Sequence, residues 1–340
     1  MLKTAVIGLG YWGPNLVRNL SKTKGVEVKY LCDLSQANLD NWKSFHGATL
    51  TTDYRDILSD PSIDAVAIAT PVSTHFRLAS DALNAGKHVL LEKPMALNVN
   101  ECAELIRIAE DKKLVLQVDH TYLYTGAVRR IKEIVSSGEL GDVLYFDSVR
   151  VNLGLFQHDV NVVWDLAPHD LSIMDYVIPH RCIAVSGSGI SNFGGDLENI
   201  AFATLYFDSG VIAHINVNWL SPVKIRRIII GGTKKMIVFN DLEPSDKLKI
   251  YDKGVDLKNS DLDGIYSTLV KYRTGDMLAP NVDGTEALKY ECNHFAECIR
   301  TGARPITDGE MGMRVVALIA AINESIANDG KKIEIGVAAI

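Results

Sequence analysis

The chain has 340 residues, of which 47% are hydrophobic and 23% are charged, as is usual for a globular protein that can bury two cores. Its formal net charge of −7 argues against nucleic acid as a partner. The first core strand is predicted from about residue 3, and the longest apolar run covers only residues 315–322, so neither a signal peptide nor a membrane span is expected. We therefore expect a cytoplasmic protein with no membrane partner.

The first third of the chain alternates predicted strands with predicted helices. Strands are expected near residues 3–8, 26–32, 64–69, 87–91 and 114–118, and helices near 14–22, 36–45, 73–85 and 98–112. Such alternation is typical of a parallel sheet with helices on both faces. The sequence therefore predicts an α/β fold that begins with a doubly wound parallel sheet over residues 1–120.

The pattern changes beyond about residue 122. Strands are expected near residues 143–153, 182–190, 199–207, 211–219, 224–230 and 235–239, with helices near 125–137, 167–177, 283–300 and 309–328. Short turn signals such as DSG at 208–210 join several of these strands, which favours antiparallel pairing. Residues 121–340 are thus predicted to form an α+β domain with a largely antiparallel sheet.

Five cysteines are spread along the chain without a C-x-x-C pair. They are Cys32, Cys102, Cys182, Cys292 and Cys298. Core packing is the expected role of each, and we predict no metal site and no disulfide.

The stretch KTAVIGLGYWGPNLVRNL, residues 3–20, has glycines in G-x-G-x-x-G order between an apolar strand and a helix. Gly8 would permit a tight turn, Gly10 would let a pyrophosphate approach the backbone, and Gly13 would let the helix pack close to the strand. The backbone amides of Tyr11 and Trp12 would face the phosphates at the positive end of the helix. Such turns also occur for purely structural reasons, but strand, turn and helix follow here in the order that a dinucleotide site requires.

Asp33 ends the second predicted strand, about twenty residues beyond the glycines, where a carboxylate can accept hydrogen bonds from ribose hydroxyls. The same charge would repel a 2′-phosphate, and no arginine follows at 34 or 35. We therefore predict NAD as the cofactor in preference to NADP. An aspartate at this position can also act only as a helix N-cap.

Two further strand ends carry polar residues, in IATPVSTH at 68–75 and LLEKP at 90–94. Open α/β sheets bind ligands at the carboxyl ends of their strands. The residues expected to line one cofactor crevice are Thr70, Pro71, His75, Glu92 and Lys93. Lys93 is held stiffly, because Pro94 restricts the backbone before it. His75 is also compatible with a surface position in the first turn of its helix.

The segment WDLAPHD places Asp165 and His169 four residues apart, hence on one face if the helix has already begun there. Taken alone, this pair is also compatible with helix capping. Together, GLGYWG, Asp33, ATPVSTH, EKP and WDLAPHD resemble the successive signatures of the Gfo/Idh/MocA oxidoreductases, in that family's order over essentially the whole chain.

This resemblance implies an N-terminal Rossmann domain and a C-terminal domain whose large open, mostly antiparallel sheet commonly mediates oligomers. A homo-oligomer, dimer or tetramer, is therefore expected. The resemblance also implies catalytic roles for Lys93, Asp165 and His169. Histidine titrates near neutral pH, so His169 is the candidate acid/base, Lys93 would stabilise charge on the reacting oxygen, and Asp165 would orient the pair. Whether Lys93 or His169 moves the proton is left open.

Other polar residues of the second half are candidate substrate contacts: Tyr122, Arg150, Gln157, His158 and Asn161. By resemblance, the substrate is a nucleotide-activated sugar, as for UDP-N-acetylglucosamine or UDP-N-acetylglucosaminuronate 3-dehydrogenases of surface-polysaccharide pathways. The alternatives are a free sugar or inositol dehydrogenase, a ketoreductase of a deoxysugar nucleotide, an NAD-assisted glycosidase, and a non-catalytic dinucleotide-binding regulator.

Overall fold

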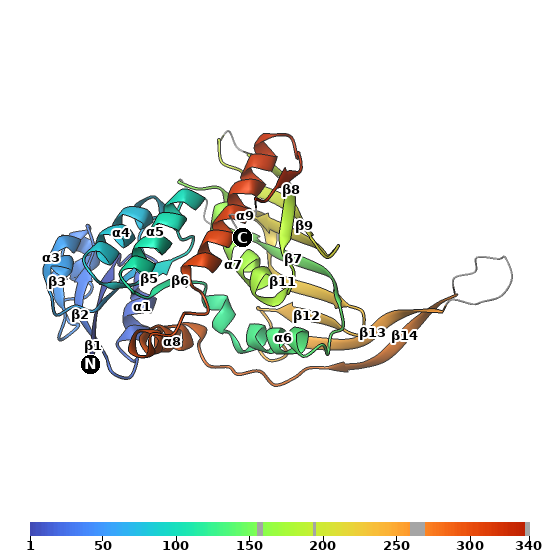
Figure 1. Ribbon diagram of the computed structural model, residues 1–340, viewed down its shortest axis with the longest axis horizontal. Helices are drawn as coiled ribbons and strands as arrows, with labels where there is room; N and C mark the ends of the chain where they lie inside the picture. Colours follow the sequence, from blue (N-terminus) through green and yellow to red (C-terminus); the bar gives the residue numbers. More distant parts are fainter. Residues whose placement is uncertain (155–158, 193–194, 259–268, 337–340) are drawn as a thin grey trace. The chain divides into compact units, whose positions relative to one another are not determined.

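The computed structural model describes residues 1–154, 159–192, 195–258 and 269–336 (Figure 1). Within these ranges the chain forms two compact units. The first comprises Met1–Thr125 and Thr285–Ala320, and the second comprises Gly126–Gly284 and Ala321–Gly336. The chain therefore contributes to the first unit twice, once from each end of the sequence.

The first unit is built on a parallel sheet with strand order β3-β2-β1-β4-β5-β6. The strands are β1 (Leu2–Ile7), β2 (Val26–Cys32), β3 (Thr49–Thr51), β4 (Ala65–Ile68), β5 (His88–Glu92) and β6 (Leu116–Asp119). Because β2 and β4 flank β1 on opposite sides, the direction of winding reverses between β1 and β4, where such sheets bind ligands. The predicted doubly wound sheet is confirmed, with the short β3 as an unpredicted addition.

Helical segments connect these strands. They are α1 (Gly13–Leu20), α2 (Gln36–Asp40), α3 (Tyr54–Ser59), α4 (His75–Asn84) and α5 (Val99–Asp111), with the 3-10 turns η1 (Val72–Thr74) and η2 (Thr121–Tyr124). α1 starts at the third glycine, Gly13, with Pro14 in its first turn, where the missing N–H has no intrahelical partner. Its residues Leu16, Val17 and Leu20 lie at helical spacing and are buried.

Residues near the end of the chain complete the first unit. α8 (Ala287–Thr301) packs on α1 and η2 and buries Cys292 and Phe295 in the core cluster that α1 also enters. The following segment covers the edge of β6, since the Val118 amide donates to the Thr307 carbonyl at 2.8 Å. This hydrogen bond occupies an edge that would otherwise present unpaired backbone groups. α9 (Gly309–Ala327) follows.

The second unit contains a larger sheet with strand order β14-β13-β12-β11-β7-β10-β9-β8-β15. The strands are β7 (Val143–Leu153), β8 (Cys182–Ile190), β9 (Ile200–Phe207), β10 (Ile212–Asn218), β11 (Leu220–Gly232), β12 (Met236–Asn240), β13 (Leu248–Lys258), β14 (Leu269–Leu278) and β15 (Ile333–Glu334). The described pairings are antiparallel apart from that of β7 with β10. The expected largely antiparallel sheet is confirmed, whereas β13, β14 and β15 were not predicted.

One face of this sheet is covered by helix. α7 (Val162–Val177) contacts β7, β9 and β10 and also packs on α6 (Gly126–Ser136), as Figure 1 shows. On the covered face Phe146, Ile215 and Leu205 are buried, while on the opposite face Phe202 is 41% and Ile212 is 46% exposed. Strand residues alternate between faces, so the open face retains an apolar character.

Within the part of the chain that the structure describes, no helix is long and apolar enough to cross a membrane. The five cysteines are buried as free thiols, in keeping with core packing.

Candidate active site

The glycine loop joins β1 to α1 and leaves little room for side chains at two of its positions. Gly8 has φ +94°, and a Cβ there would lie 2.3 Å from the Ala69 carbonyl oxygen. A Cβ on Gly13 would lie 1.9 Å from the Gly8 carbonyl oxygen. Among the described residues, no atom lies within 4 Å of such a Cβ on Gly10, so its backbone is open to an approaching ligand. These features fit a dinucleotide pyrophosphate at the start of α1.

The two bulky residues of the loop differ in environment. The Tyr11 side chain is 93% exposed. Trp12 is partly buried, and its indole Nε1 donates to Asp119 Oδ2 at 2.6 Å. Only one of the two rings therefore projects into solvent, while the other fastens the loop to the end of β6.

Asp33 lies at the end of β2 and touches the glycine loop. The Leu9 amide donates to its Oδ2 at 2.7 Å, and the Ser35 amide donates to its Oδ1 at 2.8 Å. The N-cap of α2 is Ser35, whose Oγ accepts from the Asn38 amide, so Asp33 is not the cap of that helix. Each carboxylate oxygen has a second lone pair with which it can accept from a ribose hydroxyl.

His75 opens α4 and is buried, in contrast to the surface position considered for it. Its Nδ1 lies 2.8 Å from the Pro94 carbonyl oxygen, and its Nε2 lies 2.8 Å from the Thr70 carbonyl oxygen. Burial lowers the pKa of His75, and the two carbonyls act in the opposite direction. The imidazole thus joins the segments that follow β4 and β5. Thr70, Pro71 and Lys93 lie on these two segments.

The residues of the WDLAPHD segment lie within α7, which begins at Val162. Asp165 and His169 are one helical turn apart and partly buried. The Trp219 indole Nε1 donates to Asp165 Oδ2 at 3.0 Å, which holds the carboxylate in one orientation. Lys93 belongs to the first unit, and Asp165 and His169 belong to the second.

Three of the candidate substrate contacts, Asn161, Tyr122 and Arg150, form hydrogen bonds within the protein. Asn161 caps α7, accepting from the Val163 and Trp164 amides, and its own amide donates to Glu198 and Asn323. Tyr122 lies in η2, where its carbonyl accepts from the Thr125 hydroxyl at 2.7 Å. The remaining two candidates, Gln157 and His158, lie outside the described residues.

Arg150 and Asp170 form a buried ion pair beneath α7. The guanidinium donates from Nε to Oδ2 at 2.7 Å and from Nη2 to Oδ1 at 3.0 Å. The two side chains are only 5% and 2% exposed. The planar fork of Arg150, considered above as a substrate contact, is therefore bound bidentately by Asp170. This pair ties β7 to the helix that bears His169.

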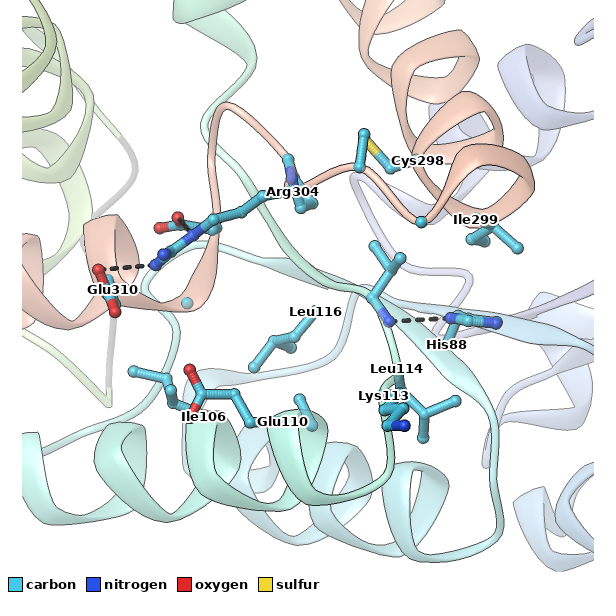
Figure 2. Close-up of a pocket in the computed structure, with 17 residues that line it drawn as sticks. His88, Ile106, Glu110, Lys113, Leu114, Leu116, Cys298, Ile299, Arg304 and Glu310 are labelled. Carbon is cyan, nitrogen blue, oxygen red and sulfur yellow. Dashed lines mark hydrogen bonds and ion pairs between the residues drawn. The ribbon is translucent and has the colours of Figure 1, made fainter.

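A pocket of about 480 Å³ lies at the other end of the first unit's strands (Figure 2). His88 and Leu116, which begin β5 and β6, line it together with Ile106 of α5 and Arg304, which is paired with Glu310 at 2.6 Å. Because the predicted cofactor residues follow the carboxyl ends of the strands, this pocket is separate from them.

The residues that sequence reasoning missed are Asp119 and Glu291. Asp119 ends β6 as the predicted residues end β4 and β5, and this position is the signal that could have revealed it. Glu291 carries no local signal, because α8 lies far along the chain from α1 and η2, on which it packs.

Comparison with known protein families matches most of the chain. Residues 2–120 match the model of an oxidoreductase family with an NAD-binding Rossmann fold, and residues 128–238 match the GFO/IDH/MocA C-terminal domain. The scyllo-inositol 2-dehydrogenase (NAD(+)) of Bacillus subtilis (strain 168) is 27% identical over 346 residues, 95% of this chain and 93% of that protein. Oxidoreductase YdgJ of Escherichia coli (strain K12) is 30% identical over 270 residues, 72% of this chain and 73% of that protein.

Among solved structures, UDP-N-acetylglucosamine 3-dehydrogenase GnnA from Acidithiobacillus ferrooxidans superposes with a TM-score of 0.79 at 23% identity, covering 96% of this chain and 98% of that one. This likeness concerns the fold. The parallel sheet, its glycine loop and the acidic residue after β2 define an oxidoreductase that binds NAD. The chain belongs to the Gfo/Idh/MocA oxidoreductase family, as its sequence motifs indicated.

Proposed function

We propose that the protein is an NAD-dependent dehydrogenase or reductase that transfers hydride at a secondary hydroxyl, C3, of a nucleotide-activated sugar such as a UDP-linked N-acetylamino sugar. The observation that carries the reaction class is the pair on α7. His169 lies one turn from Asp165, and Trp219 holds Asp165 at 3.0 Å. A fixed carboxylate beside a partly buried histidine is suited to general acid/base chemistry.

NAD, held by the glycine loop and Asp33, would supply a hydride acceptor for the C–H bond of the carbinol carbon. As that C–H bond breaks with its electron pair, the hydroxyl proton must leave so that the C=O bond can form. In the proposed mechanism His169 takes this proton and returns it in the reverse direction, with Lys93 as the alternative proton carrier. Lys93 stabilises negative charge on the reacting oxygen, and Asp165 orients the imidazole. The chain thus supplies position and proton transfer, while the cofactor supplies the redox chemistry.

The sugar-nucleotide substrate rests on the resemblance of GLGYWGPNLVRN, HTYLY and WDLAPHD to members that act on UDP-sugars, and the fold of GnnA is compatible with it. A diphosphate is commonly bound by arginine. Arg226 pairs in register with Arg150, so it lies on the covered face of its sheet, and its Nη1 is 3.4 Å from Asp241. We propose Arg226 in preference to Arg150 as the diphosphate contact, because Asp170 already occupies the Arg150 fork.

A free polyol is the second candidate substrate. The observation in its favour is the scyllo-inositol 2-dehydrogenase of Bacillus subtilis, which is 27% identical over 95% of this chain. Both candidates share the hydride-transfer mechanism and differ only in what the second unit must recognise.

A direct comparison of substrates tests the proposal. Purified protein with NAD is incubated with UDP-N-acetylamino sugars and, separately, with free inositols and sugars, and NADH formation is recorded. We expect saturable turnover with a UDP-sugar and binding of that sugar by calorimetry. Turnover of a free polyol without binding of any UDP-sugar would select the second candidate. Enzyme-bound NAD that never exchanges would instead indicate an NAD-assisted glycosidase.

Cofactor selectivity depends on the charge of Asp33. We expect Asp33→Asn to narrow the preference for NAD over NADP by roughly tenfold, because the amide no longer repels a 2′-phosphate and binds the ribose hydroxyls less strongly. Asparagine keeps a side-chain oxygen that can accept from the Leu9 amide, whereas Asp33→Ala removes this acceptor. Comparing the cofactor affinities of the two variants therefore separates the effect of the charge from that of the hydrogen bond to the glycine loop. Calorimetric titration of both cofactors measures the effect, and an unchanged ratio in Asp33→Asn contradicts the assignment.

Two further properties belong to the proposal. The open face of the second sheet exposes Phe202 and Ile212 beside polar strand residues, which supports a homo-oligomer formed through this face, and light scattering of the purified protein measures the assembly. We also propose a cytoplasmic location for the protein.

A further inference from the structure

Hydrogen-bond donors converge on Asp119, the last residue of β6. Its side chain is buried, and it accepts hydrogen bonds from the Trp12 indole at 2.6 Å and from the Thr121 hydroxyl. Trp12 belongs to the glycine loop after β1, whereas β6 is the last strand of the sheet. The indole therefore reaches from the loop past two intervening strands to this carboxylate.

Two more carboxyl groups lie against Asp119. Glu92 ends β5 and pairs with Asp119 in the parallel register. Glu291 of α8 is 0% exposed. Within the described residues, no donor satisfies Glu92 Oε2 or either carboxyl oxygen of Glu291. Buried polar atoms rarely lack a hydrogen-bond partner, so the missing donors at the two glutamates need a physical explanation.

Three ionised carboxylates cannot share one buried site without a large electrostatic cost. Burial raises the pKa of Glu92 and of Glu291 well above the usual range, and the adjacent Asp119 raises both further. A protonated glutamate can donate to Asp119, which an ionised one cannot. Protons on both glutamates therefore give them hydrogen bonds to Asp119. The cluster then keeps one negative charge, on Asp119, which the Trp12 and Thr121 donors face.

Two further titratable groups, His120 and Lys93, lie beside the carboxyl cluster. Burial lowers the pKa of His120 to about 4, so this imidazole is neutral at neutral pH. Lys93, on the β5 side, acts on Glu92 by lowering its pKa, but less strongly than burial and Asp119 raise it. The hydrogen bonds from Trp12 and Thr121 stabilise the Asp119 carboxylate.

The position of Trp12 gives this bond a consequence for the loop. Trp12 is the N-cap residue of α1, and it makes no side-chain hydrogen bond to that helix. It directly precedes Gly13, where the helix packs tightly on the turn. The indole bond to Asp119 therefore holds the start of α1 from outside, in place of a capping side chain.

We propose that Asp119 is a positioning residue for the NAD-binding loop: with Glu92 and Glu291 as neutral donors, its carboxylate holds Trp12 and so fixes the turn that receives the pyrophosphate. This inference rests on NAD binding by the glycine loop and not on the identity of the sugar. The buried acidic cluster then orders the glycine loop before NAD binds. The cofactor does not have to order this loop itself, which favours binding.

The test is a double-mutant cycle on NAD affinity in the full-length protein without any sugar. Asp119→Ala and Trp12→Phe should each weaken NAD binding by roughly tenfold, because each removes the hydrogen bond between the indole and the charged carboxylate. The double variant should be no weaker than the single ones, since both remove the same bond. Trp42→Phe, which replaces a tryptophan elsewhere in the unit, should bind NAD as the wild type does. Additive losses, or normal affinity in Trp12→Phe, overturn the proposal.

An infrared measurement tests the charge assignment without relying on NAD affinity or on the folding of Asp119→Ala. The wild type should show the infrared carbonyl band of a buried protonated carboxyl at neutral pH, and Glu291→Gln should lose part of it. Absence of this band in the wild type overturns the assignment of neutral donors. Because neither measurement includes a sugar, a failed substrate screen leaves both results interpretable.

Discussion

Replacing His169 by alanine should reduce turnover by roughly 10²-fold or more while leaving NAD affinity close to that of the wild type. General acid/base groups typically contribute this much, because without them the proton of the reacting hydroxyl has no positioned acceptor. His169 lies on α7, in a different unit from the glycine loop, so the change should spare cofactor binding. Steady-state kinetics with the best substrate and calorimetry with NAD measure the two effects.

Lys93→Met should lower turnover to a similar extent, since methionine retains the length of the side chain but not its positive charge. His180→Ala and Lys43→Met are suitable controls, because both residues are exposed and lie outside the proposed machinery. Both controls should keep wild-type turnover. Near-normal activity in His169→Ala and Lys93→Met together would show that these residues only support the fold. A change in the pH profile in one variant alone would identify the proton carrier.

Breaking the Arg150–Asp170 pair should destabilise the protein by about 3–5 kcal/mol, because either single variant leaves a buried charge without its partner. Arg150→Met and Asp170→Asn are expected to lower the free energy of unfolding measured by denaturant titration. The double variant Arg150→Met/Asp170→Leu should recover part of the loss, since it buries no unpaired charge.

An exposed pair provides the control for this prediction. Arg107→Gln removes an ion pair with Glu104 whose side chains are 59% and 42% exposed, and it should change stability by less than about 1 kcal/mol. Equal losses in Arg150→Met and Arg107→Gln would contradict the structural role of the buried pair. If Arg150→Met instead raised KM in a fully folded protein, Arg150 would be a substrate contact after all.

Several features of the site could be predicted because they depend on neighbours in the sequence. Gly13 is required because a Cβ there would meet the Gly8 carbonyl within the same turn. Gly8 is required because a Cβ there would meet Ala69, which follows β4. Asp165 and His169 share a helix face because four residues make about one turn. The parallel and antiparallel parts of the fold were likewise visible in the alternation and spacing of apolar segments.

Other residues have partners far along the chain that no local pattern reveals. Arg150 and Asn161 looked available for substrate, but Asp170, Glu198 and Asn323 engage their side chains. β13 and β14 were missed because their polar sequences, KIYDKG and RTGDML, show no clear alternation of apolar residues.

The sequence by itself determined the doubly wound fold, since this follows from local backbone requirements and periodicity. The family followed from the resemblance of its motifs to those of known members. Only the tertiary structure decided which buried side chains support those motifs. Trp12 and Asp119 are separated by 107 residues, and Glu291 comes from a helix that returns from the far end of the chain. Such contacts are decided by how the elements pack to bury their apolar faces, and no local pattern records that packing.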